Sequence, residues 1–256
     1  MAKKTTGVSG DGKLISSTAM TKIGKTMTKA LAVYGAGGFG REVVCLVEDI
    51  NRVSPRYEIV GFVDDDPAMV GNVLNGYPVL GAAGALSSRP GLSVAVAVGD
   101  PVTRMRIVER LRRQDVTFPN LVHPSVVMGA EVIMGIGNVI CAGSVLTVNI
   151  RLGDFCQLNL KTTVGHDAVL GHFATSACGV DFAGYSRMGV GTYFGNHATV
   201  LQSVHVGPFT TVGAGAVVNR DLPPGVTAVG VPAKVIKERP DLGRLEVEFS
   251  SYLESD

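Results

Sequence analysis

Apolar residues recur at every sixth position over nearly a hundred residues in the second half of the chain. The series begins at Val122 and ends at Val218, and Ser176 is its one polar member. Its members are Val122, Met128, Met134, Ile140, Leu146, Leu152, Leu158, Val164, Leu170, Ser176, Phe182, Met188, Phe194, Val200, Val206, Val212 and Val218. No α-helix repeats at six residues, whereas a stacked β-solenoid does, so the pattern predicts short strands wound into coils.

The residues around each aliphatic position predict how a coil turns. Glycine often follows the aliphatic residue directly, and Ser, Thr, Ala or Val mostly stands four positions after it. We expect the aliphatic side chain to point inward, the small residue to fit the corner, and Gly or Asn to adopt the strained backbone of the turn. Three six-residue units then close one coil of about eighteen residues. The series contains between five and six such coils, which makes a prism roughly 27 Å long.

A glycine-rich segment near the N-terminus predicts a phosphate-binding loop. The apolar strand Leu31–Tyr34 comes first, the segment Gly35-Ala36-Gly37-Gly38-Phe39-Gly40 follows at once, and an amphipathic helix is expected over about residues 41–50. In this context Gly-x-Gly-x-x-Gly lets a phosphate approach the backbone amides at the start of the helix. We therefore place Gly35, Gly37, Gly38 and Phe39 in a substrate-binding site.

Two further strands predict a small parallel sheet. The strand Tyr57–Val63 ends in Asp64 and Asp65, and acids at the tip of a second strand commonly contact a ribose or a base edge. A strand over 92–98 precedes Asp100, which we expect to cap a helix over 102–113 and to lie in the substrate site. A closing strand is expected over 116–118. Residues 30–118 thus predict a Rossmann-like α/β domain that is short for a dinucleotide, which favours one nucleotide over NAD.

Composition and charge bear on the rest of the chain. Residues 1–29 carry six Lys and one Asp with almost no large apolar residues, which predicts a disordered tail. Residues 119–222 form the predicted solenoid, and 223–256 should cover the open edge of its last coil. The formal net charge of +1 argues against nucleic acid as the main partner. No apolar run is long enough for a signal peptide or a membrane span, so a cytoplasmic location is expected.

The histidine spacing argues against a metal centre and singles out one residue. Counted in eighteens, the five histidines fall on different lines of the prism, so we expect no metal site within one chain. His166 falls on the outer side of its coil beside Asp167, and Gly184 should lie one coil above it, about 4.8 Å away. A surface histidine is an equally good interpretation of the spacing alone. If the site instead transfers an acyl group, His166 would accept the proton and Asp167 would fix its tautomer. The backbone N–H of Gly184 would stabilise the oxyanion.

The segment Asn159–Asp167, with the sequence NLKTTVGHD, resembles the signature of the bacterial sugar acetyltransferases with hexapeptide repeats. That family includes sialic acid O-acetyltransferases and UDP-4-amino-sugar N-acetyltransferases. The segments 35–42, 62–65 and 229–234 resemble its nucleotide-sugar loop, base-contacting turn and C-terminal acetyl-CoA segment, in the family's order. The resemblance implies a Rossmann-like domain followed by a left-handed parallel β-helix. It also implies a homotrimer with active sites between the prisms.

Carried over position by position, the resemblance implies a role for each matching residue. His166 would be the general base, Asp167 its partner, and Asn159 would lie near the acceptor. Many family members have His where this chain has Phe39, so a sugar contact of that side chain is lost, and some have His at Thr175. The residues implied to bind acetyl-CoA are Thr175, Gly184, Asn196, Ala214 and Lys234.

Three functions remain open at this point. The first is acetyl-CoA-dependent N-acetylation of a nucleotide-activated amino-sugar in surface-glycan synthesis, by direct attack with His166 as base. The second is O-acetylation of sialic acid or a related sugar, which the same residues could perform. The third belongs to another class, a non-catalytic scaffold that binds a nucleotide-sugar. The sequence leaves the nucleotide and the sugar undetermined.

Overall fold

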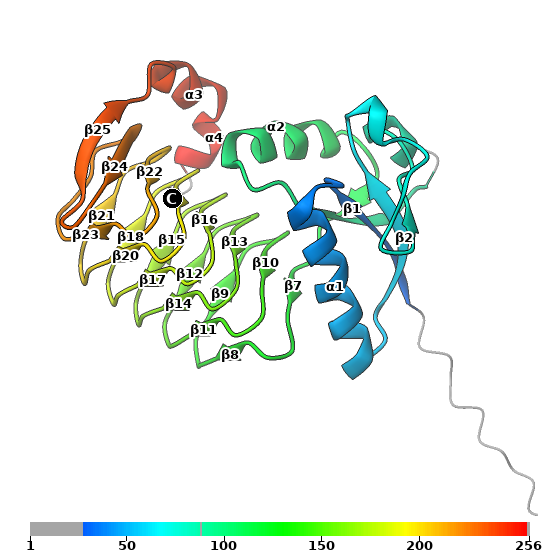
Figure 1. Ribbon diagram of the computed structural model, residues 1–256, viewed down its shortest axis with the longest axis horizontal. Coiled ribbons are helices and arrows are strands. Elements are labelled where there is room, and N and C mark those ends of the chain that lie inside the picture. Colours follow the sequence, from blue (N-terminus) through cyan, green and yellow to red (C-terminus); the bar gives the residue numbers. More distant parts are fainter. Residues whose placement is uncertain (1–27, 88, 255–256) are drawn as a thin grey trace, which may run out of the picture.

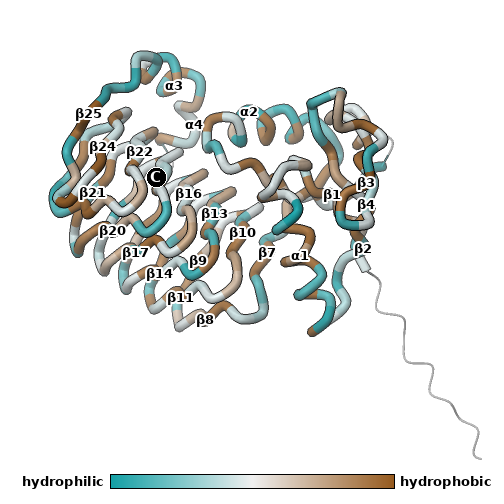
Figure 2. Tube along the Cα trace, viewed as in Figure 1, coloured by the Kyte–Doolittle hydropathy of each residue, from teal (hydrophilic) through white to brown (hydrophobic). Residues whose placement is uncertain are grey.

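An α/β domain lies beside the first coils of a parallel β-solenoid in the computed structural model, which describes residues 28–87 and 89–254 (Figure 1). This arrangement confirms the predicted fold class. The predicted tail, residues 1–29, lies almost entirely outside the described residues. Figure 2 shows hydrophobic stretches that recur along successive coils, as the six-residue period predicts.

The α/β domain is built on a parallel sheet with the strand order β2-β1-β5-β6. Alternate residues of β1 enter different cores: Leu31 and Val33 pack with α1, whereas Ala32 and Tyr34 pack with α2. The elements are β1 (Lys29–Tyr34), α1 (Gly38–Val53), β2 (Tyr57–Val63), β5 (Leu92–Val96), α2 (Pro101–Leu111) and β6 (Val116–Thr117). The chain leaves β1 toward one edge of the sheet and β5 toward the other, which places a crevice between the carboxyl ends of these two strands.

Smaller elements connect β2 to β5. They are the short helix η1 (Pro67–Met69), the hairpin strands β3 (Val73–Leu74) and β4 (Tyr77–Pro78), and the short helix η2 (Ala83–Leu86). Helix α1 begins at Gly38, three residues earlier than the sequence predicted, so the second half of the glycine segment is already helical. The amides of the first helical turn therefore belong to the glycine loop itself.

The solenoid confirms the eighteen-residue coil. Residues eighteen apart are Cα partners in parallel pairs, as in Val139 with Gln157 and Thr163 with Asp181. From Ile140 onward the residues of the six-residue series are buried inside, and Phe182 packs edge-on against Phe194 with ring centroids 4.9 Å apart. The strands are β7 (Leu121–Val122), β8 (Val127–Met128), β9 (Ile133–Met134), β10 (Val139–Ile140), β11 (Val145–Leu146), β12 (Arg151–Leu152), β13 (Gln157–Leu158), β14 (Thr163–Val164), β15 (Val169–Leu170), β16 (Thr175–Ser176), β17 (Asp181–Phe182), β18 (Arg187–Met188), β19 (Tyr193–Phe194), β20 (Thr199–Val200), β21 (His205–Val206), β22 (Thr211–Val212) and β23 (Val217–Val218).

The strained turns of the coils lie at one fixed position of the six-residue unit. The φ angle is positive three residues after the aliphatic position, for instance 59° at Asp167 and 61° at Phe173. Many of these turn residues are neither Gly nor Asn, so the expectation was wrong in its residue types. The glycines directly after the aliphatic residue are needed because the next coil packs too closely for a side chain. A Cβ at Gly129 would lie 2.0 Å from the carbonyl oxygen of Thr147 in that coil.

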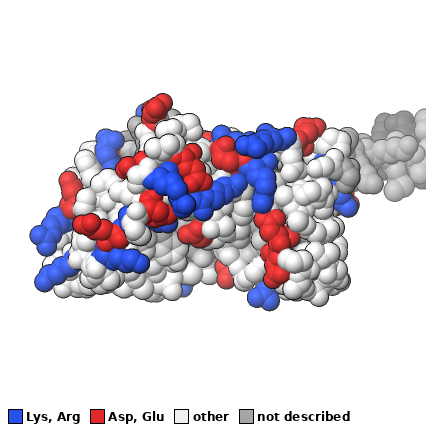
Figure 3. Space-filling model, turned by 90° about the horizontal axis from the view of Figure 1, so that it is seen from above, with Lys and Arg blue, Asp and Glu red and all other residues white. Residues whose placement is uncertain are grey.

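The C-terminal segment closes the solenoid and then returns along α2 (Figure 1). Strand β24 (Val226–Val229) pairs with β22, and β25 (Lys234–Glu238) pairs antiparallel with β24. Helices α3 (Leu242–Glu248) and α4 (Ser250–Leu253) follow; Tyr252 Oη donates to Glu109 at 2.6 Å and Arg106 pairs with Glu248. Basic and acidic side chains alternate over this face in Figure 3. In the described part of the chain, no helix has the length and apolar character needed to cross a bilayer.

Candidate functional site

The glycine loop forms one wall of the crevice at the end of the sheet. Gly35 has φ +106°, and a Cβ there would lie 2.7 Å from the carbonyl oxygen of Ala97 beside β5. A Cβ at Gly40 would lie only 1.8 Å from the carbonyl oxygen of Gly35. Gly37 and Gly38 are exposed, with no atom near the Cβ position of either. The loop therefore leaves open space over the N-terminus of α1, where an anionic phosphate is favoured.

Asp64 and Asp100 already have backbone partners. The Oδ2 atom of Asp64 accepts from the N–H of Ala36 at 2.7 Å, and its Oδ1 atom accepts from the N–H of Asp66 at 2.9 Å. Asp64 thus fastens the tip of β2 to the glycine loop. Asp100 accepts from the N–H of Thr103 at 2.7 Å, which confirms the predicted helix cap with Pro101 at the first helical position.

Asp65 belongs to a cluster that links β1, β2 and α2. Its carboxylate accepts from Tyr34 Oη at 2.7 Å and from Arg110 Nη2 at 2.5 Å, and Arg110 also donates to the Tyr34 oxygen. Partial burial would raise the pKa of Asp65, but the bonds from Tyr34 and Arg110 outweigh it and lower that pKa. The substrate roles predicted for Asp64, Asp65 and Asp100 stay predictions, and each carboxylate has a structural role beside them.

A cavity of about 230 Å³ lies where the crevice meets the outer surface of the solenoid. It brings together three residues that the sequence singled out, Phe39 from α1 and Asn159 and Thr175 from the solenoid. Phe39 is half-buried, and Asn159 Oδ1 accepts from the N–H of Leu160 at 2.7 Å. The other lining residues are Glu42, Gly99, Gln157, Ser176, Ala177 and Tyr193. The α/β domain and the solenoid thus build this cavity jointly.

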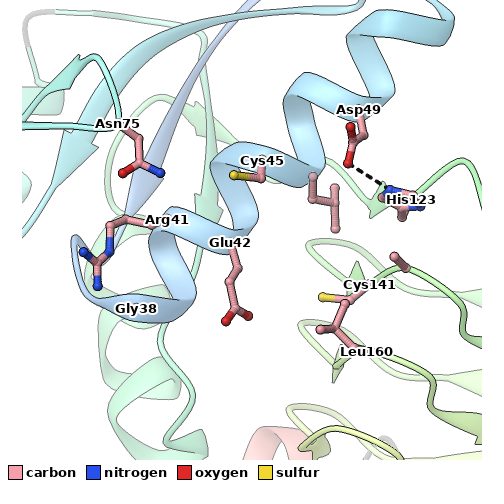
Figure 4. A pocket seen from close by; sticks show the side chains of 11 residues that line it. Gly38, Arg41, Glu42, Cys45, Asp49, Asn75, His123, Cys141 and Leu160 are labelled. Atoms are coloured by element: carbon pink, nitrogen blue, oxygen red, sulfur yellow. Dashed lines mark hydrogen bonds and ion pairs between the residues drawn. The ribbon is translucent and has the colours of Figure 1, made fainter.

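A second cavity of about 480 Å³ continues along α1, and Figure 4 shows its lining. His123 Nε2 lies 3.1 Å from Asp49 Oδ2 and joins α1 to the first coil. The N–H of Ser125 donates to His123 Nδ1 at 3.0 Å, so the ring proton is on Nε2. The lining residues are Gly38, Arg41, Glu42, Cys45, Leu46, Asp49, Asn75, His123, Cys141, Ala142 and Leu160. Glu42 borders both cavities.

Arg104 is a residue that the sequence did not single out, and it holds two residues that line the first cavity, Gln157 and Thr175. Its side chain is 1% exposed, and burial lowers its pKa to about 10. The guanidinium joins the end of β5 to two coils of the solenoid. It donates to the carbonyl oxygens of Val98, Phe155 and Phe173, to Gln157 Oε1 and to Thr175 Oγ1, at 2.6–3.2 Å. Its place on the apolar stripe of the predicted helix was the available signal, because Met105, Val108 and Leu111 flank it.

His166 lies at the corner between β14 and β15, away from the α/β domain. Its Nδ1 is 2.9 Å from Asp167 Oδ2, and Asn149 Nδ2 donates to Asp167 Oδ1 at 3.3 Å. The bond to His166 lowers the pKa of Asp167. Tyr185 stacks edge-on against the imidazole with centroids 5.0 Å apart, and the imidazole is 49% exposed. Because Nδ1 is held by the carboxylate, Nε2 is the atom that remains to accept a proton.

Gly184 lies directly over His166, as the register predicted. A Cβ at residue 184 would be 2.6 Å from Nε2 of His166, and the N–H of Tyr185 donates to the His166 carbonyl at 2.9 Å. A side chain at 184 would displace the imidazole. The bare backbone beside Nε2 is therefore a requirement of this corner.

The other residues expected to bind acetyl-CoA lie at a different corner. Asn196 and Ala214 are exposed after β19 and β22, on the line of coils that also carries Leu160. Asn196 Oδ1 accepts from the N–H of Cys178 at 3.1 Å, and Lys234 is exposed at the start of β25. Thr175 is buried, and its hydroxyl is bonded to Arg104. These assignments stay predictions, as do those of His166, Asp167 and Asn159. Over the described ranges, no group of three or more His, Cys, Asp or Glu could hold a metal ion.

Comparison with known proteins identifies the family. The model of the PglD N-terminal domain matches residues 30–111. The acetyltransferase domain of PglB from Neisseria gonorrhoeae is 32% identical, with a TM-score of 0.75 over 82% of this chain and 100% of that chain. The chain belongs to the sugar acetyltransferases with hexapeptide repeats.

Two further relatives are similar over most of their length. GDP-perosamine N-acetyltransferase from Escherichia coli O157:H7 is 29% identical over 81% of this chain and 96% of its own. A perosamine N-acetyltransferase from Caulobacter crescentus, solved with CoA and GDP-perosamine after replacement of one histidine by asparagine, is 30% identical. Its TM-score is 0.74, over 82% of this chain and 97% of that chain. The Neisseria domain has also been solved with acetyl coenzyme A. This acetyltransferase is thus an enzyme, and the scaffold hypothesis is excluded.

Proposed function

We propose that this acetyltransferase transfers the acetyl group of acetyl-CoA to the amino group of a nucleotide-activated sugar. The observation that carries the proposal is the His166–Asp167 pair under the bare backbone of Gly184. Support for the acceptor comes from the relatives, because two of them are perosamine N-acetyltransferases and one is solved with GDP-perosamine and CoA. O-acetylation of a sugar is the second candidate.

The two substrates would occupy different parts of the molecule. The nucleotide and its phosphates would lie in the crevice beside Gly37 and Gly38, with the sugar in the cavity lined by Phe39 and Asn159. Acetyl-CoA would run along the corner of Asn196 and Ala214 toward Lys234. Under this proposal residues 30–118 bind the nucleotide-sugar, 119–222 carry the transfer site and 223–256 cover the last coil. Such a product would enter glycan synthesis.

The chemistry would be a direct displacement. The amine lone pair attacks the thioester carbonyl, an N–C bond forms, and the C–S bond breaks to release the thiol of CoA. His166 Nε2 accepts one proton from the attacking nitrogen and returns it to the departing sulfur. Asp167 holds the Nδ1–H tautomer, and the N–H of Gly184 stabilises the developing oxyanion. General-base assistance of this kind contributes about 10²–10⁴-fold to the rate.

We further propose a homotrimer whose sites lie between subunits. Within one chain, Asn159 follows β13 and His166 follows β14, so they stand at successive corners of the coil. Six residues of extended chain separate two such corners, roughly 20 Å of contour. The histidine of a second copy would therefore complete the cavity beside Phe39.

The test is the His166→Asn variant in a thiol-release assay with acetyl-CoA and GDP-perosamine. We expect kcat of this variant to fall about 10²–10⁴-fold, with an unchanged thermal unfolding temperature. Mass spectrometry before and after hydroxylamine separates the products, because hydroxylamine cleaves an ester and leaves an amide. His205→Asn, which replaces an exposed histidine on strand β21, is the matched control. Turnover of His166→Asn near the wild-type value would reject the mechanism, and a hydroxylamine-labile product would favour O-acetylation.

A further inference from the structure

Glu42 projects from α1 into the space between the two domains. It borders both the cavity of Phe39 and Asn159 and the larger cavity of Cys141 and Leu160. Figure 4 shows its carboxylate extending from the helix into the open space, while Arg41 points away from it. The negative charge of Glu42 also reaches the solenoid. Burial raises the pKa of the Cys141 thiol to about 12, and the charge of Glu42 contributes to this rise.

The carboxylate of Glu42 lacks the side-chain partners that the other acids of the same helix have. Glu48 accepts from Tyr77 Oη at 3.1 Å, and Asp49 pairs with Arg52 and His123. Within residues 28–87 and 89–254, the carboxylate of Glu42 has no hydrogen bond or ion pair. An acid that lines two cavities and has no side-chain partner among the described residues is available to a ligand.

The distance of Glu42 from the glycine loop matches the position of the far side of a bound sugar ring. Glu42 lies four residues after Gly38 on the same helix, which is roughly 6 Å along the axis. A phosphate held over the amides of the glycine loop would thus direct the attached ring along α1 toward Glu42. Phe39, one turn earlier and lining the same cavity, would offer that ring an apolar surface in place of the polar contact that a histidine would make.

An amine and a hydroxyl differ in the number of hydrogens that the attacking atom carries. An amine carries two, so it can keep one N–H bonded to a carboxylate while the other proton leaves for His166. A hydroxyl carries one, which must leave during attack, so nothing remains to donate to Glu42. An unpaired carboxylate beside the hydroxyl oxygen would repel its developing negative charge. A carboxylate at this place therefore favours N-acetylation.

We propose that Glu42 accepts a hydrogen bond from the acceptor amine and selects an amino-sugar over its hydroxyl counterpart. This inference rests on the proposed function and names the residue that decides between its two candidate reactions. Glu42 would bind and orient the amine, whereas His166 removes the proton.

The experiment compares Glu42→Met and Glu42→Gln with the wild type on GDP-perosamine and on a GDP-sugar with a hydroxyl in place of the amine. Loss of a charged hydrogen bond should raise KM for the amino-sugar about 10- to 100-fold in Glu42→Met, with an intermediate value in Glu42→Gln. The KM for acetyl-CoA and the thermal unfolding temperature should stay unchanged, and the activity on the hydroxyl sugar should not fall. Glu58→Gln, an exposed acid on β2, is the matched control.

The outcomes separate this inference from the proposed function. If the wild type acetylates the amine and Glu42→Met keeps the same ratio of kcat/KM for amine over hydroxyl, the inference is wrong and the function stands. If the wild type acetylates no amine, the function fails, and calorimetric binding of GDP-perosamine to wild type and Glu42→Met decides the inference. Equal affinity would then overturn it, and a tenfold loss would support the contact.

Discussion

A Cβ atom on residue 184 would stand 2.6 Å from Nε2 of His166, although eighteen residues separate the two in the chain. The stacking of coils produces this contact, because each residue lies over the one that precedes it by a full coil. The imidazole is half exposed, so it can rotate away if that space is filled.

Gly184→Ala should therefore damage catalysis more than stability. The added methyl group displaces Nε2 while Asp167 still holds the ring, and a misplacement of about 1 Å can cost about 10²-fold in rate. We expect kcat to fall by about that factor with a small change in unfolding temperature. Gly243→Ala, where a Cβ meets no atom within 4 Å, is the control. An unchanged kcat would show that this corner takes no part in the chemistry.

Asp64→Ala should weaken binding of the nucleotide-sugar. The variant leaves the N–H of Ala36 without its acceptor and loosens the glycine loop, which then keeps the bond from the N–H of Gly35 to the Val63 carbonyl. Hydrogen bonds to charged groups contribute about 1.5–3 kcal/mol, so Kd measured by calorimetry should rise about tenfold or more. Asp66→Ala removes the same charge two residues away from the loop contact and should have a smaller effect. Equal Kd values for the two variants would contradict the role of Asp64.

Arg104→Met should destabilise the joint between the domains. Several buried oxygens, including those of Phe155 and Phe173, would lose their donor, and each unsatisfied buried group costs about 1–3 kcal/mol. We expect urea unfolding to show a loss of at least about 3 kcal/mol. Arg106 lies in the same helix as Arg104, and Arg106→Met breaks only its exposed pair with Glu248 of α3, so this variant should cost less than about 1 kcal/mol. Similar losses in the two variants would argue against an anchoring role.

Tyr34→Phe should lower stability in a pH-dependent manner. The pKa of Asp65 is lowered in the folded protein, so its contribution is present above the ordinary value near 3.8 and is lost as pH falls through the lower folded value. Burial and Asp65 raise the pKa of Tyr34, so the contribution of the phenol is lost as pH rises above its ordinary value of 10.

The difference between wild type and Tyr34→Phe should thus be about 1 kcal/mol at neutral pH and shrink toward both extremes. Unfolding by urea at several pH values between 3 and 11 measures it. A difference that is constant over this range would mean that the Tyr34 hydroxyl is not linked to the charge of Asp65.

The six-residue period predicted the solenoid because each residue there meets a neighbour at a fixed distance in the chain. The contact of His166 with Gly184 and the cap at Asp100 follow from local spacing in the same way. The residue types of the turns could not be predicted in this way. Phe155 and Phe173 adopt positive φ because their rings pack under α2. Their tertiary contacts outweigh the local preference for Gly or Asn at such a position.

The partners in a contact between domains have no such signal in the sequence, even where burial of one residue does. Arg104 is one of several arginines in its helix, and nothing in its spacing shows that it meets carbonyl groups of Phe155 and Phe173, some fifty to seventy residues away. The same holds for Glu42, whose significance comes from the two cavities that it borders. The roles carried over from the family concern the residues around the reaction, and these contacts determine where such residues stand.

The return of α3 and α4 to α2 has a consequence for synthesis of the chain. Leu245, Phe249 and Tyr252 complete a core that also holds Tyr34 and Met105. Translation delivers those helices after the whole α/β domain, so this domain emerges from the ribosome with one side of its core still uncovered. Until α3 and α4 are released, this exposed apolar surface is available to a chaperone, and a truncation that removes the two helices would leave it open permanently.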